Sequence, residues 1–187
     1  MRKGIRYNSP VVLTFALLGL LALLLDKLTA GLTTAKLFCV YRSPLSDALT
    51  YPRFFLHVLG HNGISHYLSN MLLFLVVGPS VEERYGSKKL LISMLICAFI
   101  TGLVQFIFFP GSALLGASGI VFMMIVMLSI TGTRGSGIPL TMVLVLALYI
   151  GKEILAGVTS IDNISQLTHI IGGVCGLVLG LSYRHGR

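Results

Sequence analysis

Long apolar runs alternate with short polar segments along almost the whole chain. A helix needs roughly 20 residues to cross a hydrocarbon core about 30 Å thick, and most of these runs approach or exceed that length. The stretch from Leu90 to Thr133 has no charged side chain and is long enough to cross, turn and return. The pattern predicts an all-α integral membrane protein with six transmembrane helices. The expected spans are residues 8–25, 54–78, 89–109, 118–133, 138–158 and 164–183.

The polar segments between the runs are short, and neither a soluble domain nor an internal repeat is visible in the sequence. We therefore expect a single membrane domain over residues 1–187. The longest segment, Asp26–Arg53, contains the apolar stretch LFCVY, which predicts a loop lying partly in the membrane interface. The first apolar run, Val11–Leu25, follows a basic N-terminus. Because no small-residue cleavage site follows it closely, we interpret this run as an anchor and not as a removed signal peptide.

Composition supports a membrane protein. Apolar residues make up 55% of the chain and charged residues only 11%, far below the soluble average of about 25%. The net charge of +8 comes from basic residues at the ends of the apolar runs, where they set topology, so nucleic-acid binding is not expected. Cys39, Cys97 and Cys175 lack CxxC or metal-ligand spacing and are interpreted as small apolar residues.

The distribution of basic residues predicts the orientation. With the N-terminus inside, nine of the 14 Lys and Arg residues fall on the inner side, as is typical of cytoplasmic loops. Both termini are therefore expected in the cytoplasm, and the Asp26–Arg53 loop is expected outside.

A Gly-Ala-Ser-Gly sequence, Gly116 to Gly119, stands at the start of the fourth predicted span. Pro110-Gly111 breaks the preceding helix, so Ser118 begins a short helix below the membrane surface. Such a helix start leaves backbone N–H groups without helical partners. Irregular backbone at this depth is tolerated only where protein surrounds it or water reaches it. We expect the glycines to let a loop dip into the protein and present Ser118 to a wet cavity.

Polar side chains also lie within the second predicted span. His57 and His61, and likewise His66 and Asn70, are four residues apart, which places the members of each pair on one helix face. Ionisable residues inside a span are functional candidates by default. His57 and His61 lie near the outer end, where we expect them to brace the external loop.

The sixth predicted span carries His169 and a stripe of glycines at positions 172, 176 and 180. His169 precedes Gly172 by three residues and lies on nearly the same side of the helix. Such a stripe permits close backbone approach of another helix. If that neighbour is span four, His169 lies near Ser118.

These residue types suit nucleophilic catalysis. A serine hydroxyl needs a base, and neutral histidine is the side chain best tuned for that role near pH 7. Attack on an amide creates an oxyanion, for which His66, Asn70 and the backbone N–H of Ser118 are candidate donors. All six acidic residues lie in loops or near span ends, so a Ser118–His169 dyad fits better than a triad.

The motifs resemble the rhomboid family of intramembrane serine proteases, over roughly residues 50–183. GASG resembles the family's Gly-X-Ser-Gly, which implies that Ser118 is the nucleophile. THIIGGVCG resembles the family's His-X-X-Gly-X-X-X-Gly helix, which implies that His169 is the base. Each motif is loose by itself, but four in the right order on the right spans are specific.

The other two motifs lie on span two and its inner end. His66 and Asn70 match the family's His-X-X-X-Asn, whose side chains contribute to the oxyanion hole, and His61 matches a structural histidine before it. Glu82 and Arg84 match the family's Glu-X-Arg, a structural element.

The chain departs from the family pattern at two positions. The external loop of the family usually carries Trp-Arg, whereas this chain has Pro52-Arg53, so an aromatic anchor is lost. Four residues after the nucleophile the family commonly has a tyrosine that stacks on the catalytic histidine, and this chain has Phe122. Phenylalanine keeps the ring but not the hydroxyl. Neither change removes a reacting group.

The resemblance implies a serine endopeptidase with a short fourth helix that carries the nucleophile. Its partners are expected to be transmembrane protein substrates, cut near the outer face, and the surrounding lipid. It implies the inner membrane of a bacterial cell as the location, with both termini in the cytoplasm. It implies no cofactor and no metal.

Two other functions remain open at this point. One is a catalytically inactive rhomboid-like protein that binds transmembrane clients; such relatives typically lack the serine or the histidine, and this chain has both. The other is a metal or proton pathway through His57, His61, His66 and His169. No carboxylate or thiolate lies between His57 and Asn70, and no His-Glu-X-X-His motif is present, which disfavours a metal site.

Overall fold

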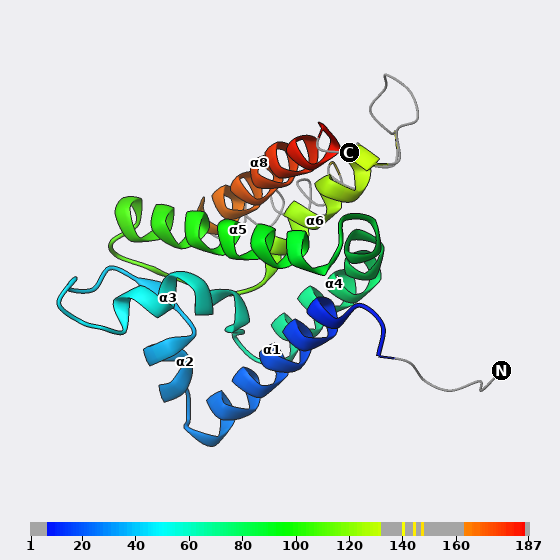
Figure 1. The fold of residues 1–187 in the computed structure, drawn as a ribbon. Helices are drawn as coiled ribbons and strands as arrows, with labels where there is room; N and C mark the ends of the chain where they lie inside the picture. The colour runs from blue at the N-terminus through cyan, green and yellow to red at the C-terminus, as the bar shows by residue number, and fades with distance from the viewer. Residues whose placement is uncertain (1–6, 132–139, 141–143, 145–146, 148–162, 186–187) are drawn as a thin grey trace.

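The computed structural model describes residues 7–131, 140, 144, 147 and 163–185, and almost all of them belong to helices (Figure 1). The elements in chain order are α1 (Pro10–Leu28), α2 (Leu32–Leu37), β1 (Val40–Tyr41), α3 (Thr50–Leu56), the 3-10 helix η1 (His57–Leu59), α4 (Ile64–Tyr85), α5 (Ser87–Phe108), β2 (Ala113–Leu114), α6 (Ser118–Thr131) and α8 (Asn163–His185). β1 and β2 pair as a short antiparallel ladder.

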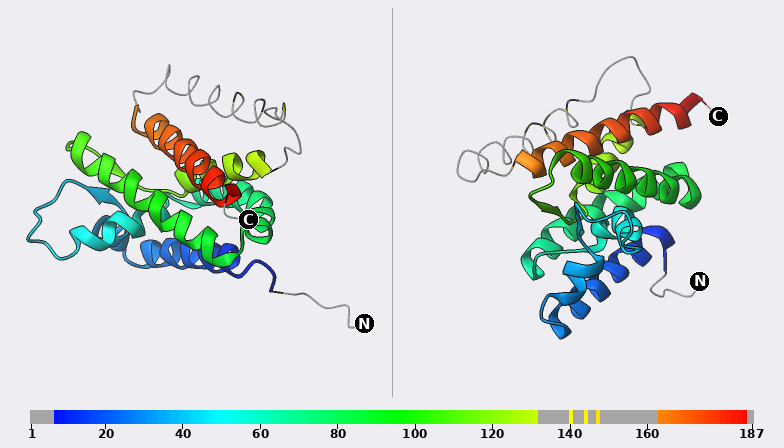
Figure 2. Two further views of the ribbon diagram at one scale, coloured as in Figure 1. Left: turned by 45° about the horizontal axis from the view of Figure 1, so that its top comes forward. Right: turned by 90° about the vertical axis from the view of Figure 1, so that its left-hand side faces the viewer.

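Helices α1, α4 and α5 are each long and apolar enough to cross a membrane. Their outward sides carry large apolar residues, such as Leu72 and Val76 of α4, which are each 68% exposed. Exposed aliphatic side chains along long helices suit a lipid environment. Figures 1 and 2 show α8 running beside α6, and α6 also contacts α4 and α5.

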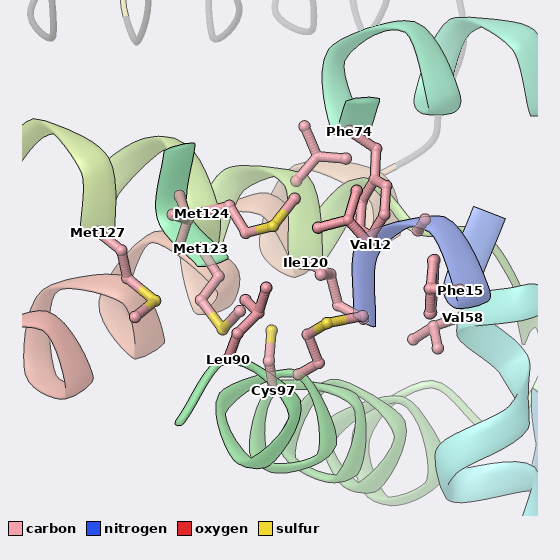
Figure 3. Packing of buried hydrophobic residues seen from close by; sticks show 14 of the residues in the cluster. Val12, Phe15, Val58, Phe74, Leu90, Cys97, Ile120, Met123, Met124 and Met127 are labelled. Atoms are coloured by element: carbon pink, nitrogen blue, oxygen red, sulfur yellow. The ribbon is translucent and has the colours of Figure 1, made fainter. Parts of the chain in front are cut away.

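Helix α6 is the most enclosed of the described helices, because its side chains are buried on every side. Met123, Met124 and Met127 pack among side chains from α1, α4 and α5, including Val12 and Leu90 (Figure 3). Methionine is flexible and fills irregular gaps between helices of different direction. The sequence predicted a helix here, and α6 occupies that range. Its place as the central fourth helix of a six-helix bundle stays a prediction.

The prediction of one continuous span over residues 54–78 is wrong. The chain forms α3 and η1 first, breaks at Gly60 to Gly63, and only then begins α4 at Ile64. A Cβ at Gly60 would collide with the carbonyl oxygen of Phe38, and Gly63 has a φ of +92°. Glycine at both positions therefore allows the chain to break between η1 and α4.

This break changes the first histidine pair. His57 lies in η1 and His61 follows it in the turn, so the two do not share the face of one helix. His66 and Asn70 do lie four residues apart on α4, as predicted.

Helix α4 also continues past the predicted end at residue 78. Pro79 lies inside the helix, and α4 ends only at Tyr85, with Gly86 alone joining it to α5. The predicted gap between the spans ending at residue 78 and beginning at residue 89 is therefore wrong, because α4 and α5 occupy it apart from Gly86. Gly78 allows the approach of α1, because a Cβ there would lie 2.8 Å from Val12 Cγ2. Proline is accommodated because tertiary packing outweighs the local loss of one helical hydrogen bond.

The remaining elements agree with the predictions to within a few residues, except in the first loop. Residues 26–53 were predicted as a loop and contain α2, β1 and the start of α3. Span five, at residues 138–158, lies outside the described residues apart from positions 140, 144 and 147, so the count of six spans stays a prediction.

Glu82 links the C-terminal end of α4 to the start of α1. Its carboxylate accepts hydrogen bonds from the backbone N–H groups of Val11 and Val12, each at 3.0 Å, and from the Ser87 hydroxyl at 2.7 Å. Ser9, at the N-cap of α1, makes no side-chain cap bond. A negative charge on the first N–H groups of a helix is favourable, so Glu82 replaces the missing local cap from another helix.

We expect Glu82→Ala to lower the free energy of unfolding by about 2 kcal/mol, because buried N–H groups at the start of α1 lose a charged acceptor. Thermal melting of the purified protein in detergent measures the effect. The neighbouring and exposed Glu83 provides the matched control, and Glu83→Ala should melt like the parent. Equal melting of the two variants would show that Glu82 does not hold α1.

Candidate active site

Ser118 is the first residue of α6 and is half-buried. The segment before it leaves β2 at Leu114 and turns at Gly116, whose φ of +121° favours glycine. The N–H of Gly116 donates to the carbonyl oxygen of His57 at 3.0 Å. The first helical hydrogen bond of α6 runs from the N–H of Val121 to the carbonyl oxygen of Ala117. The backbone N–H groups before Val121 therefore lie ahead of the helical hydrogen bonds.

His66 and Asn70 lie against this turn. The N–H of Asn62 donates to Nδ1 of His66 at 3.2 Å, so in the neutral ring the proton is on Nε2, which is then a donor. A Cβ built on Gly116 would lie 3.0 Å from this Nε2 and 3.8 Å from Nδ2 of Asn70. Nδ2 of Asn70 donates one hydrogen to the carbonyl oxygen of His66 at 3.1 Å and has a second. Two side-chain donors therefore adjoin the turn before Ser118.

Helices α6 and α8 meet backbone to backbone next to Ser118. A Cβ at Gly172 would overlap the carbonyl oxygen of Gly119, and a Cβ at Gly119 would lie 3.1 Å from Cγ2 of Thr168. The stripe continues along α8, where a Cβ at Gly176 would overlap the carbonyl oxygen of Met123. The stripe predicted from the sequence therefore faces α6.

His169 is buried and stacks on Phe122 of α6. The ring centroids are 4.7 Å apart and the planes differ by 14°. The predicted contact between these two rings is present. Ser118 lies one helical turn before Phe122 on the same face of α6. The turn of α8 that carries His169 therefore packs on the turn of α6 that begins with Ser118.

The ring of His61 packs against the ring of His66. Its Nδ1–H donates to the carbonyl oxygen of Leu59 at 3.0 Å, and its ring meets the rings of His66 and Tyr67 edge to face, with centroids 5.2 and 5.3 Å away. Tyr67 in turn donates its hydroxyl to the carbonyl oxygen of Ala16 in α1 at 3.0 Å. His61 thus limits the positions that the His66 ring can take.

The remaining predicted residues lie elsewhere. Glu82 binds the start of α1, and Arg84 is exposed in the last turn of α4. Arg53 is buried in α3, where it organises the loop before that helix.

The sequence did not reveal the part that His57 plays beside Ser118. Its carbonyl oxygen accepts the N–H of Gly116, while its ring donates from Nδ1 to the carbonyl oxygen of Arg53 at 3.1 Å and places Nε2 3.3 Å from Oγ1 of Thr101 in α5. The sequence predicts only a brace for the external loop. Every residue has a backbone carbonyl, so the identity of residue 57 does not indicate this contact.

The histidines do not form a common metal site in the described part of the chain, where no three His, Cys, Asp or Glu residues gather at one point. His57, His61 and His66 each use Nδ1 on a nearby backbone group. The contacts therefore assign these three rings to local support and to the turn at Gly116.

The family model described as the Rhomboid domain matches residues 49–186. The matched range begins in front of α3 and includes the site residues from Arg53 to Gly176. The elements α1, α2 and β1 precede it.

The glycine contact leads to a test of stability. We expect Gly172→Ala to destabilise the protein by about 1–3 kcal/mol, because the added methyl group must push α8 away from the Gly119 backbone. Gly173→Ala is the control, since a Cβ there meets only Cγ2 of Val126 at 3.9 Å. Its melting temperature should stay the same or rise, because alanine favours a helix more than glycine does. Identical melting of both variants in detergent would contradict the close approach.

Proposed function

The chain belongs to the rhomboid family, and on that premise we propose that it is an intramembrane serine endopeptidase. The observation that carries the proposal is the stacking of His169 on Phe122, one turn after Ser118, across a glycine contact between α6 and α8. Nucleophilic catalysis by serine requires a base held beside the hydroxyl. The Phe122 ring restrains the imidazole for that purpose.

In the proposed reaction His169 takes the proton of the Ser118 hydroxyl while Oγ attacks the carbonyl carbon of a peptide bond. The oxyanion that forms accepts hydrogen bonds from the His66 Nε2–H, from the Asn70 amide and from the backbone N–H of Ser118. His169 then gives its proton to the leaving amine. Water, activated by the same imidazole, hydrolyses the acyl-enzyme and regenerates Ser118.

The donor set is consistent with this chemistry. The bond from the Asn62 N–H to Nδ1 of His66 fixes the tautomer in which Nε2 donates. Gly116 leaves room for that ring, because any side chain there would meet it. The helix start at Ser118 adds backbone donors and the positive end of the helix dipole.

The substrates in this proposal are transmembrane segments of other proteins. A substrate helix must unwind locally before its amides can reach Ser118, so we expect small, helix-breaking residues near the cleavage point. The protein is an integral membrane protein with apolar helices that suit a lipid surround. We further propose six spans, cytoplasmic termini and a bacterial inner membrane.

The alternative is a rhomboid-like protein that binds transmembrane clients without cutting them. The chain keeps both a serine at the start of α6 and a histidine on the facing helix, together with two side-chain donors beside the turn. A binder has no use for this combination of groups, and the combination favours the enzyme.

We expect Ser118→Ala and His169→Ala each to reduce cleavage of a model transmembrane substrate on the order of 10⁴-fold or more, because members of a dyad act as a unit. Cleavage is measured in detergent or liposomes, and thermal melting shows that each variant is folded. Turnover by either variant near the parent rate would refute the mechanism.

Reaction with a fluorophosphonate probe separates the two functions. An enzyme should be labelled on Ser118, and the label should disappear in Ser118→Ala. A folded parent protein that takes up no label and cuts no substrate, yet retains transmembrane clients on purification, would establish the binder.

The Phe122 ring has its own test. Phe122→Tyr should keep activity within about tenfold of the parent, because the added hydroxyl contributes one hydrogen bond at most. Phe122→Ala should lose far more, since His169 then loses the ring that restrains it. Steady-state cleavage rates decide, and equal rates for Phe122→Ala and the parent would show that another contact positions the histidine.

A further inference from the structure

Arg53 of α3 is an organising centre for the external loop. Its side chain is 4% exposed, and it donates from Nε to the carbonyl oxygen of Lys36 at 2.8 Å. From Nη1 it donates to Oγ of Ser43 at 3.3 Å and to Oδ2 of Asp47 at 3.0 Å. The backbone N–H of Leu49, and then Arg53, lower the pKa of the Asp47 carboxyl group. Arg53 thereby connects Lys36, Ser43 and Asp47 of the segment before α3.

The aromatic ring of Tyr41 lies against the guanidinium group of Arg53. Cζ of Arg53 lies 4.7 Å from the centroid of the Tyr41 ring, within cation–π range. Pro52 stands directly before Arg53 and offers no aromatic face. The ring therefore comes from a residue distant in sequence, on strand β1.

β1 connects this contact to the catalytic segment. Tyr41 pairs with Ala113 and Val40 with Leu114, so each residue of β1 faces one residue of β2. Only three residues separate Leu114 from Ser118, and Gly116 among them is pinned by the carbonyl oxygen of His57. The β1–β2 pairing and the bond at Gly116 together set the path of the chain into α6.

The ladder is held from both of its faces. Successive residues of a strand point to opposite faces. On one face Val40 and Leu114 pack with Phe54 in a small apolar cluster. On the other face Tyr41 lies under Arg53, the residue before Phe54. Arg53 and Phe54, which are adjacent in α3, thus contact opposite faces of the β1–β2 pair.

We propose that Tyr41 is a positioning residue for the nucleophile, holding β1 against β2 through its contact with Arg53. The effect on catalysis rests on the proposed function, whereas the effect on the ladder does not. A ladder of two residues per strand is unstable by itself and depends on the side chains that cover it. Loss of the Tyr41 ring therefore loosens the segment that leads to Ser118.

Hydrogen–deuterium exchange of the full-length protein in detergent tests the first step. Tyr41→Leu should speed exchange at residues 113–117 by about tenfold, while Tyr41→Phe, which keeps the ring, should exchange like the parent. Tyr51→Leu is the matched control, because Tyr51 is exposed and its hydroxyl donates to the carbonyl oxygen of Leu45. Unchanged exchange in α4 and α5 verifies that the variants are folded. Parent-like exchange at residues 113–117 in a folded Tyr41→Leu would overturn the proposal.

The rate of fluorophosphonate labelling tests the second step, because the small probe reports on Ser118 without a transmembrane substrate. Tyr41→Leu should label about tenfold more slowly and lower kcat by a similar factor at a nearly constant KM, with recovery in Tyr41→Phe. Faster exchange with unchanged labelling would overturn the link to Ser118. Absence of label on the parent protein would refute the proposed function, and the exchange result would then still decide whether Tyr41 holds the ladder.

Discussion

The site depends on one contact, the meeting of the α6 and α8 backbones at Gly119 and Gly172. A side chain on Gly172 would occupy the space of the Gly119 carbonyl. Because neither residue has one, the helices come close enough for His169 to stack on Phe122, beside the turn that begins with Ser118. Lipid chains are as apolar as the helices, so the hydrophobic effect does not drive helices together within the membrane. Close packing of small residues supplies the attraction in its place.

A second set of contacts holds the other side of Ser118. Gly116 fits against His66 and Asn70 of α4, and its N–H is bound by the carbonyl oxygen of His57. The start of α6 is therefore placed between α4 and α8. A geometry defined from two sides suits the nucleophile role proposed for Ser118, because small displacements of reacting groups have large effects on rate.

Several polar side chains bond to groups on other helices, and each of these bonds joins two elements. Glu82 of α4 caps α1, and the Tyr67 hydroxyl donates to the carbonyl oxygen of Ala16. The Tyr85 hydroxyl donates to the carbonyl oxygen of Met127 in α6 at 2.9 Å. An unpaired polar group in an apolar surround carries a large penalty, so these bonds specify which helices pair. Burial of Met127 and its neighbours alone would leave that choice open.

The sequence by itself determined a helical membrane protein, most helix positions, the candidate residues and the small-residue face of α8, because these follow from apolar run length, residue chemistry and helical period. The pairing of His66 with Asn70 was likewise predictable, since four-residue spacing is local. Only the tertiary structure decided the break before Ile64, the passage of α4 through Pro79 and the ring of Tyr41 under Arg53. These features depend on contacts between residues far apart in the chain, which override local apolar periodicity and helix propensity.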